Sequence, residues 1–357
     1  MDIRHVIDFN DITPEQWDAL CALGGEIKAS PRDFERACEH KIMATLFYEP
    51  STRTQLSFQT AMMRLGGKVM GFADPSSSSV SKGETLRDTV KIISAYSDVT
   101  VIRNPVEGAA YAASLYSRVP IINAGDGGHL HPTQTMTDMF TIQQNFGRYQ
   151  GLTIGLCGDL LNGRTVHSLV RALSRYEGNT FYFISTAELK MPSYVTELLR
   201  KTNNTLYEVE TLDECISRLD ILYMTRIQRE RFKTAEDYAK QSGIYILTAE
   251  KMKQAKSDMI ILHPLPKVDE IDYDVDDDPR ARYFEQAENG MYIRMALIHE
   301  VCINNSRIAM PGAYPAPSPA YCRNPRCISN HEKYLPPMIK ETDGHHFCAY
   351  CDHKLKV

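Results

Sequence analysis

The chain has 357 residues, of which 43% are hydrophobic and 24% are charged. This composition is typical of folded globular proteins and unlike that of disordered or fibrous ones. Its 40 basic and 45 acidic residues give a formal net charge of −5, which provides no basic field for general nucleic-acid binding. No apolar run is long enough to span a membrane, and the charged N-terminal segment lacks the apolar core of a signal peptide. We therefore expect a cytoplasmic protein with no membrane partner and two large domains plus a small appendage.

Apolar runs alternate with helix-like segments along the first part of the chain. Residues 13–16 (TPEQ) form a capping-box pattern that predicts the start of a helix. Residues 42–47 (IMATLF) have the pattern of a strand buried on both faces of a parallel sheet. A helix then follows up to Gly66 and Gly67. Further strands are expected at 99–102 and 120–123, and further helices at 109–116 and 133–146.

The alternation restarts after Gly151. Strands are expected at 152–159, 180–185, 220–224, 244–247 and 259–262, and helices at 166–173 and 291–301. Strands that alternate with helices over two blocks predict an α/β fold with two doubly wound parallel-sheet domains. We place the first domain at residues 1–133 and the second at 134–289, with a helix over 290–306 that packs back on the first.

Polar and basic residues follow the predicted strands, at the sheet edge where open α/β sheets bind ligands. Ser51, Thr52, Arg53 and Thr54 follow the first strand and enter a helix, and a simple helix cap would explain only one of these donors. Hydroxyls, helix amides and a guanidinium together favour a phosphate group. Later strands are followed by Arg103, His131, Arg164, Arg226, Gln228 and His263. This set predicts a substrate with several negative charges, and catalysis by positioning and charge stabilisation.

Four of the nine cysteines lie in the last 36 residues. Cys322 and Cys327 are separated by four residues, and Cys348 and Cys351 by two. This paired spacing is typical of a tetrahedral four-thiolate metal site, which a reducing compartment favours over two disulfides. Residues 310–321 (MPGAYPAPSPAY) are rich in proline and predict a linker in front of a metal-binding domain at 322–357. Four nearby histidines are alternative candidates for metal ligands: His331, His345, His346 and His353.

Seven segments, in order along residues 1–308, resemble aspartate carbamoyltransferases. They are YEPSTRT, SVSKGETLRDT, IRNPVEGAA, NAGDGGHLHPTQT, GDLLNGRTVHSL, ILYMTRIQRER and HPLPKVDEI. The resemblance implies transfer of the carbamoyl group of carbamoyl phosphate to L-aspartate in pyrimidine synthesis, with no cofactor for catalysis. Ornithine carbamoyltransferases share the phosphate half but typically have His-Cys-Leu-Pro where this chain has HPLP at 263–266. That family, and a non-catalytic scaffold that binds a partner through the cysteines, are the alternatives.

The resemblance also implies a role for each candidate site residue. The phosphate would be bound by Ser51, Thr52, Arg53, Thr54 and Arg103. The carbamoyl oxygen would face Thr54, Arg103 and His131, and the carbamoyl amide would contact Gln134 and the carbonyls of Pro264 and Leu265. L-Aspartate would be bound by Lys82, Arg164, Arg226, Gln228 and Leu265. Lys82, which would also bind carbamoyl phosphate, and Ser79 would come from the neighbouring subunit of a homotrimer, and either Ser78 or Ser79 would contact the phosphate.

The C-terminal segment resembles the zinc-binding domain of the separate regulatory chain of some aspartate carbamoyltransferases. The resemblance implies a fusion protein with one structural Zn²⁺ per chain, bound by Cys322, Cys327, Cys348 and Cys351. We expect this domain to dock on the α/β body, while the regulatory chain's nucleotide-binding domain has no room here. A nucleic-acid-binding zinc ribbon stays an alternative, because four lysines (333, 340, 354 and 356) make the tail locally basic. The acidic stretch 269–278 is either a solvated loop or a cation site.

Overall fold

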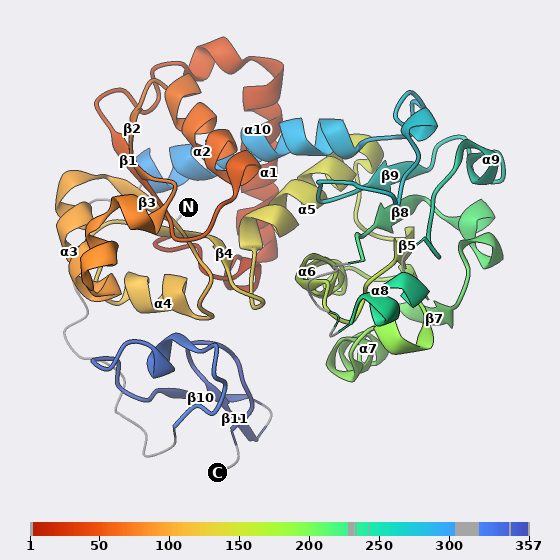
Figure 1. The fold of residues 1–357 in the computed structure, drawn as a ribbon. Coiled ribbons are helices and arrows are strands. Elements are labelled where there is room, and N and C mark those ends of the chain that lie inside the picture. Colours follow the sequence, from red (N-terminus) through yellow and green to blue (C-terminus); the bar gives the residue numbers. More distant parts are fainter. Residues whose placement is uncertain are drawn as a thin grey trace. The chain divides into compact units, whose positions relative to one another are not determined.

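The chain forms two compact units in the computed structural model (Figure 1). The first comprises residues 1–133 and 291–357, and the second comprises residues 134–290. The structure describes residues 3–227, 232, 234–241, 243–303, 321–342 and 344–355. Gln228, Lys356 and residues 304–320, which include most of the predicted linker, lie outside these ranges. Within the described ranges, no helix is long and apolar enough to cross a membrane.

A four-stranded parallel sheet forms the centre of the first unit, with strand order β2-β1-β3-β4. The strands are β1 (Ile42–Phe47), β2 (Lys68–Phe72), β3 (Val99–Asn104) and β4 (Ile121–Asp126). The helices are α1 (Pro14–Ala29), α2 (Thr52–Arg64), α3 (Leu86–Tyr96) and α4 (Ala109–Ser114). The predicted capping box starts α1: the Thr13 hydroxyl accepts from the Gln16 N–H, and the Gln16 side chain accepts from the Thr13 N–H.

The second unit contains a five-stranded parallel sheet with strand order β7-β6-β5-β8-β9. The strands are β5 (Thr153–Cys157), β6 (Thr180–Ile184), β7 (Thr205–Val209), β8 (Ile221–Met224) and β9 (Ile260–Leu262). The helices are α6 (Arg164–Leu173), α7 (Ser193–Arg200), α8 (Ala235–Gln241) and α9 (Ala249–Met252). Two helices cross the boundary between the units, α5 (Pro132–Phe146) and α10 (Tyr283–Ile303). The two parallel α/β sheets confirm the predicted fold class.

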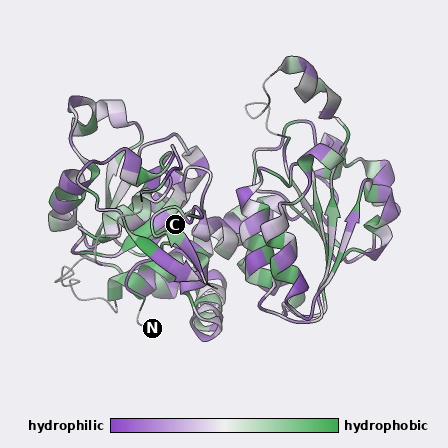
Figure 2. Cartoon of the chain, turned by 90° about the horizontal axis from the view of Figure 1, so that it is seen from below, coloured by the Kyte–Doolittle hydropathy of each residue, from purple (hydrophilic) through white to green (hydrophobic). Residues whose placement is uncertain are grey.

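One predicted strand is absent from the structure, and two strands of the structure were not predicted. Residues 244–247 do not form a strand, and only Leu247 makes an isolated bridge, to Ile271. β2 and β7 were not predicted, because both are partly exposed edge strands and their sequences, KVMGF and TLYEV, lack a continuous apolar run. Hydrophobic residues gather in the strands of both sheets, and hydrophilic ones lie mainly in peripheral helices and loops (Figure 2).

The C-terminal segment, described over residues 321–342 and 344–355 and called the tail below, packs on the rest of the first unit and shares its core. It contains an antiparallel hairpin of β10 (Ile339–Thr342) and β11 (His345–Cys348). Tyr350 makes an edge contact with Tyr111 at 5.7 Å between ring centroids. A Cβ atom on Gly108, which has φ +84°, would lie 2.6 Å from the Tyr350 carbonyl oxygen, so only glycine permits this approach. The shared cluster includes Leu86, Val90, Ala109, Ala113 and Tyr116 of the body, and Ile328, Leu335, Met338 and Tyr350 of the tail.

Glu107 is the main polar anchor of the tail. Its N–H donates to the Arg326 carbonyl (2.9 Å), and its own carbonyl accepts from the Ile328 N–H (2.9 Å). Its buried carboxylate accepts from Asn324 Nδ2 (2.6 Å) and pairs with Arg326 Nε (3.0 Å). A buried carboxylate is tolerated only when it is paired and hydrogen-bonded in this way. These contacts confirm that the tail docks on the α/β body.

The tail also caps α3. The N–H groups of Leu86 and Arg87, in the first turn of that helix, donate to Glu332 Oε1 and to the Tyr334 hydroxyl, both at 2.9 Å. The first N–H groups of a helix have no partner within the helix, so the tail supplies acceptors for two of them, and the Thr85 hydroxyl of the body accepts from a third, the Asp88 N–H. The Arg87 guanidinium also lies over the Tyr334 ring, 4.5 Å from its centroid.

Candidate active site and metal centre

The N-terminus of α2 carries the first candidate phosphate-binding group. Ser51 is the N-cap residue of this helix, and its side chain makes no capping hydrogen bond. Thr52 and Arg53 are exposed, and Thr54 is half-buried. The helix dipole and the free first-turn amides favour an anion here, and the hydroxyls of Ser51, Thr52 and Thr54 lie on the same turn.

Arg103 lies at the end of β3, where its Cα pairs in register with that of Phe47 at the end of β1. Its side chain is 12% exposed and pairs with Glu49, with Nη2 2.7 Å from Oε1. Nη1 donates to the Ala124 carbonyl (3.2 Å), whereas the buried Nε has no acceptor among the described residues. Burial lowers the pKa of Arg103 and Glu49 opposes this effect, and the group stays cationic near neutral pH. A buried cation with an unused donor favours an anionic ligand.

His131 lies beside Arg103 in the same unit. It is buried on the loop between β4 and α5, and its Nε2 lies 3.4 Å from Arg103 Nη1. Gly125, with φ +125°, makes this juxtaposition possible, because a Cβ there would lie 2.9 Å from Arg103 Nη1 and 3.5 Å from His131 Cδ2. The sequence reasoning missed Gly125 and Glu49, although both lie inside quoted motifs, NAGDGG and YEPSTRT.

The serine-rich loop is folded by its own hydrogen bonds into two 3-10 turns, η3 (Pro75–Ser77) and η4 (Ser79–Lys82). The Asp74 carboxylate accepts from the Ser76 N–H (2.8 Å), and the Ser78 hydroxyl donates to the Pro75 carbonyl (2.8 Å). The hydroxyls of Ser76, Ser77 and Ser81 are likewise used inside the loop. Ser79 and Lys82 are exposed, and within the described part of the chain the Ser79 hydroxyl has no partner. This contrast favours Ser79 over Ser78 as a ligand-binding residue.

The second unit brings two arginines to the ends of paired strands. Arg164 is the first residue of α6, after β5, and Arg226 lies two residues after β8. β5 and β8 are neighbours, with Cys157 opposite Met224. A Cβ on Gly158 would lie 2.5 Å from the Thr225 carbonyl oxygen, so the two strand ends approach closely. Both arginines are half-buried.

The HPLP turn after β9 is fixed by His263. Its Nδ1 accepts from the Leu265 N–H (2.7 Å), so Nε2 carries the proton and donates to Glu270 Oε1 (2.7 Å). Leu265 has a left-handed backbone, with φ +51°. Burial raises the pKa of Glu270, but its hydrogen bonds with His263 and with backbone N–H groups outweigh this and lower it overall.

Two aspartates of the acidic stretch 269–278 pair with basic residues that flank it. Asp276 pairs with Lys267 (3.2 Å) and Asp278 with Arg280 (2.7 Å). Among the described residues, the C-terminal cysteines are the only group of three or more His, Cys, Asp or Glu side chains close enough to hold a metal ion. The described geometry therefore favours the loop interpretation of this stretch over a cation site.

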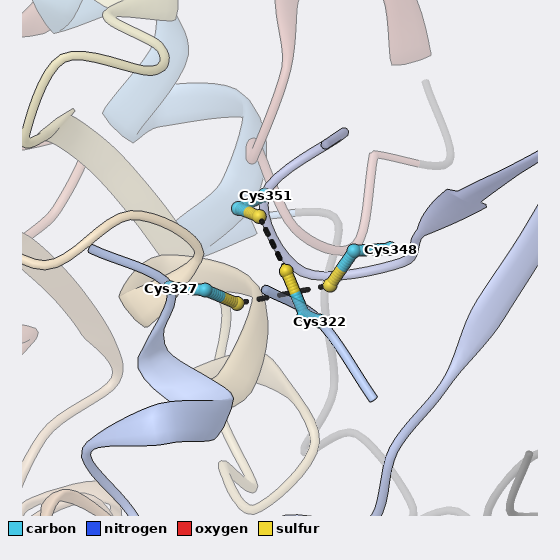
Figure 3. Close-up of side chains that lie close together, drawn as sticks. All are labelled: Cys322, Cys327, Cys348 and Cys351. Atoms are coloured by element: carbon cyan, nitrogen blue, oxygen red, sulfur yellow. Dashed lines mark hydrogen bonds between the residues drawn. The ribbon is translucent and has the colours of Figure 1, made fainter. Parts of the chain in front are cut away.

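The four C-terminal cysteines form a candidate metal centre (Figure 3). All are buried, and their sulfur atoms lie within 4.8 Å of one another. The Cys322–Cys351 and Cys327–Cys348 sulfur separations are 3.6 Å and 3.7 Å. Thiolates about 2.3 Å from a tetrahedral zinc ion would be about 3.8 Å apart, whereas a disulfide needs about 2.05 Å. The donor set therefore fits a four-thiolate metal site, and the histidine alternatives are not part of it.

Polar contacts join this centre to the loop that carries His131. Asn324 Nδ2 donates to Cys351 Sγ (3.5 Å) and also contacts Glu107 of the body. Asp352, next to Cys351 in sequence, pairs with His129 Nε2 at 3.2 Å. On its other side, His129 Nδ1 lies 3.0 Å from Asp126, at the end of β4. The loop just before His131 is therefore held from the tail and from the sheet.

Comparisons with known proteins match both units. A family described as "Aspartate/ornithine carbamoyltransferase, carbamoyl-P binding domain" matches residues 4–144, and "Aspartate/ornithine carbamoyltransferase, Asp/Orn binding domain" matches residues 150–301. The chain is 56% identical over 296 residues to the aspartate carbamoyltransferase catalytic subunit of Clostridium perfringens, covering 83% of this chain and 96% of that protein. It is 57% identical over 298 residues to that of Clostridium novyi, covering 84% and 97%.

Two solved structures are similar in fold. The catalytic subunit of M. jannaschii aspartate transcarbamoylase matches with a TM-score of 0.81 and 48% identity, covering 85% of this chain and 99% of that one. Aspartate transcarbamoylase from Trypanosoma cruzi, in complex with carbamoyl phosphate and aspartate, matches with a TM-score of 0.77 and 37% identity, covering 84% and 96%. The cysteine-bearing segment lies outside the residues that the two family descriptions match.

His129 generates a prediction about pH. Burial lowers the pKa of His129, but Asp126 and Asp352 outweigh it and raise the pKa well above its usual value. A group with a raised folded pKa contributes stability that is fully present below its unfolded pKa of about 6.5 and is lost as the pH rises through the folded value. We expect His129→Gln to lower the free energy of unfolding most near pH 6, and progressively less at higher pH.

Urea unfolding between about pH 6 and pH 9 measures this difference. His345→Gln, at an exposed position on β11, is the matched control and should show no such trend. A loss of stability for His129→Gln that is constant over this range would contradict the prediction.

Proposed function

Because the chain belongs to the aspartate/ornithine carbamoyltransferase family, we propose that it transfers the carbamoyl group of carbamoyl phosphate to the amine of L-aspartate. The products are N-carbamoyl-L-aspartate and phosphate, and the reaction belongs to de novo pyrimidine biosynthesis. The observation that carries the proposal is the buried Arg103, which has an unused Nε donor and lies beside His131. The similarity to the aspartate carbamoyltransferase catalytic subunits of the two Clostridium species supports L-aspartate as the acceptor.

The first unit binds carbamoyl phosphate. Ser51, Thr52, Arg53 and Thr54 hold the phosphate at the N-terminus of α2, together with Arg103. Thr54, Arg103 and His131 donate to the carbamoyl oxygen, which becomes negative as the amine attacks. Removing one such donor typically costs about 3 kcal/mol of transition-state stabilisation. Donors that are already in place need no reorganisation during the reaction.

The second unit binds the acceptor and the carbamoyl amide. Arg164 and Arg226, with Gln228, bind the two carboxylates of L-aspartate, since guanidinium groups suit carboxylates. Gln134 and the carbonyls of Pro264 and Leu265 accept hydrogen bonds from the carbamoyl NH₂, and Leu265 also contacts L-aspartate. The uncharged amine attacks the carbonyl carbon, the carbon–oxygen bond to phosphate breaks, and the departing phosphate takes the amine proton. Two arginines favour this dicarboxylate over the cationic side chain of ornithine.

We expect the chain to form N-carbamoyl-L-aspartate without added metal.

Charge-removing variants separate the two halves of the site. Arg53→Ala should weaken carbamoyl phosphate binding by about 100-fold, because it removes a charged phosphate donor. Arg226→Ala should raise the KM for L-aspartate and leave carbamoyl phosphate affinity unchanged.

Steady-state kinetics with both substrates measure these constants, and Arg32→Ala, at an exposed position, is the control. Turnover of ornithine in place of L-aspartate would refute the assignment. Equal losses of carbamoyl phosphate affinity in Arg53→Ala and Arg226→Ala would refute the division of roles.

The active site is completed by a neighbouring subunit of a homotrimer, through Ser79 and Lys82. The exposure of both side chains, and the Ser79 hydroxyl that the loop itself does not use, support this role. We expect Lys82→Ala and Arg53→Ala to be nearly inactive alone, and mixed subunits to regain part of the activity. Some interfaces of the mixed trimers then combine an unchanged Lys82 from one subunit with an unchanged Arg53 from its neighbour. No recovery after subunit exchange, verified by mass spectrometry of differently tagged chains, would argue for a site within one chain.

The metal of the C-terminal centre is a structural zinc ion, one per chain. Cys322, Cys327, Cys348 and Cys351 hold it, and their sulfur separations support this assignment. A four-thiolate site is closed, so the ion supplies no catalytic position. The tail is too small to fold on its own core, and bound zinc contributes on the order of 10 kcal/mol to such modules.

Removing one ligand tests the zinc site. We expect Cys348→Ser to lose the zinc and to lower the midpoint of thermal unfolding, because the tail then no longer caps α3 or supplies the partners of the buried Glu107 carboxylate. Cys215→Ser, at a buried cysteine of the second unit, is the matched control and should keep its zinc. Elemental analysis of the purified chains gives the metal content. Retention of one zinc by Cys348→Ser would contradict the assignment.

A further inference from the structure

Asp138 is a fully buried carboxylate on α5 that accepts hydrogen bonds from three side chains of the second unit. Gln134 Nε2 donates to its Oδ1 at 2.8 Å, and Gln286 Nε2 donates to the same oxygen at 2.6 Å. The Tyr223 hydroxyl donates to Oδ2 at 3.0 Å. Burial and the neighbouring carboxylate raise the pKa of Tyr223 well above its usual value, so the phenol keeps its proton and acts as the donor.

This carboxylate determines which way the Gln134 side chain faces. An ionised carboxylate only accepts hydrogen bonds, so the nitrogen of the Gln134 amide, and not its oxygen, must face Asp138. The oxygen Oε1 is then directed away from Asp138, and among the described residues no donor contacts it. Gln134 is half-buried, whereas its neighbours Thr133 and Thr135 are buried. The structure therefore leaves one oriented acceptor on the first turn of α5.

The same oxygen of Asp138 also fixes the HPLP turn. Gln286 donates to Asp138 through Nε2 and accepts from the His263 N–H through Oε1 at 2.9 Å. His263 in turn accepts from the N–H of Leu265. One carboxylate thus orients both Gln134 and the turn of Pro264 and Leu265, which the proposed function assigns to the carbamoyl NH₂. All of these groups are acceptors, and an NH₂ group is a donor.

We propose that Asp138 is a positioning residue that orients the Gln134 oxygen toward the carbamoyl NH₂, so that the chain selects carbamoyl phosphate over acyl phosphates that carry a methyl group. The proposal rests on the proposed function, because that function places Gln134 at the amide. Asp138 itself does not touch the substrate. When a methyl group replaces the NH₂ group, the Gln134 oxygen has no hydrogen-bond donor in the complex. The cost of this unpaired acceptor weakens the binding of the methyl compound and so gives the selectivity.

Two stable ligands isolate this selectivity from turnover. Phosphonoacetamide carries the NH₂ group, and 2-oxopropylphosphonate replaces it with a methyl group of similar size. Calorimetry of the full-length, zinc-loaded chain gives the dissociation constant of each. We expect Asp138→Asn to weaken phosphonoacetamide binding about tenfold, since the Gln134 amide can then turn over, and to change 2-oxopropylphosphonate binding by less than about twofold. Equal losses for both ligands, or no loss for either, would overturn the proposal.

Gln134→Leu keeps the test decisive if Asp138→Asn does not fold. It removes the acceptor and leaves Asp138 in place, and it should give the same selective loss. Tyr223→Phe removes a different donor from Asp138 and should leave the ratio of the two dissociation constants unchanged. A wild-type ratio in Gln134→Leu would refute the inference. Formation of N-carbamoyl-L-aspartate by the wild-type chain is measured separately, so failure of the proposed function is distinguishable.

Discussion

Burial of both sheets on two faces is the constraint on which the rest of the structure depends. A parallel strand that is covered on both faces is mostly apolar, so the charged residues of the candidate site lie at the carboxyl ends of the strands and in the segments that follow them. β1 is buried over almost its whole length, and the proposed phosphate-binding segment begins four residues after it ends. β5 and β8 are buried in the same way, and Arg164 and Arg226 follow them. The substrate charge that the site can neutralise is therefore set by these short connecting segments.

The same constraint explains which parts of the fold could be predicted. Central strands produce continuous apolar runs, and the predictions at β1, β3, β5 and β8 were confirmed. Edge strands such as β2 alternate irregularly between exposed and half-buried positions, so no run marks them. The prediction at 244–247 was wrong because Tyr245 and Leu247 are buried in the core of the second unit without joining its sheet. An apolar run reports burial, and only the tertiary structure decides whether a strand ladder follows.

The residues of the candidate site also differ in whether the sequence could predict them. Residues that bear charge at the end of a strand or just after it, such as Arg103 and Arg226, could be found in the sequence because their position carries the signal. Several contacts that orient the site could not be predicted, because the partners are distant in sequence. Gln286 reaches Asp138 across 148 residues, and Asn324 reaches Glu107 across 217. The cysteine spacing identified the four residues that could hold a metal ion, yet nothing in that spacing identified Glu107 as the anchor of the tail.

Asp126, Asp138 and Glu107 act in the same physical way. Each is a buried carboxylate, and a buried carboxylate is costly unless several donors surround it. Because a carboxylate cannot donate, it fixes the orientation of every amide or imidazole that faces it. Asp126 does this for His129 and Asp138 for Gln134, while Glu107 does it for Asn324 at the metal centre. Turning one of these side chains over would remove a donor from a buried carboxylate, and for the two amides it would place an oxygen against an oxygen, so each carboxylate favours one orientation of the side chain that faces it.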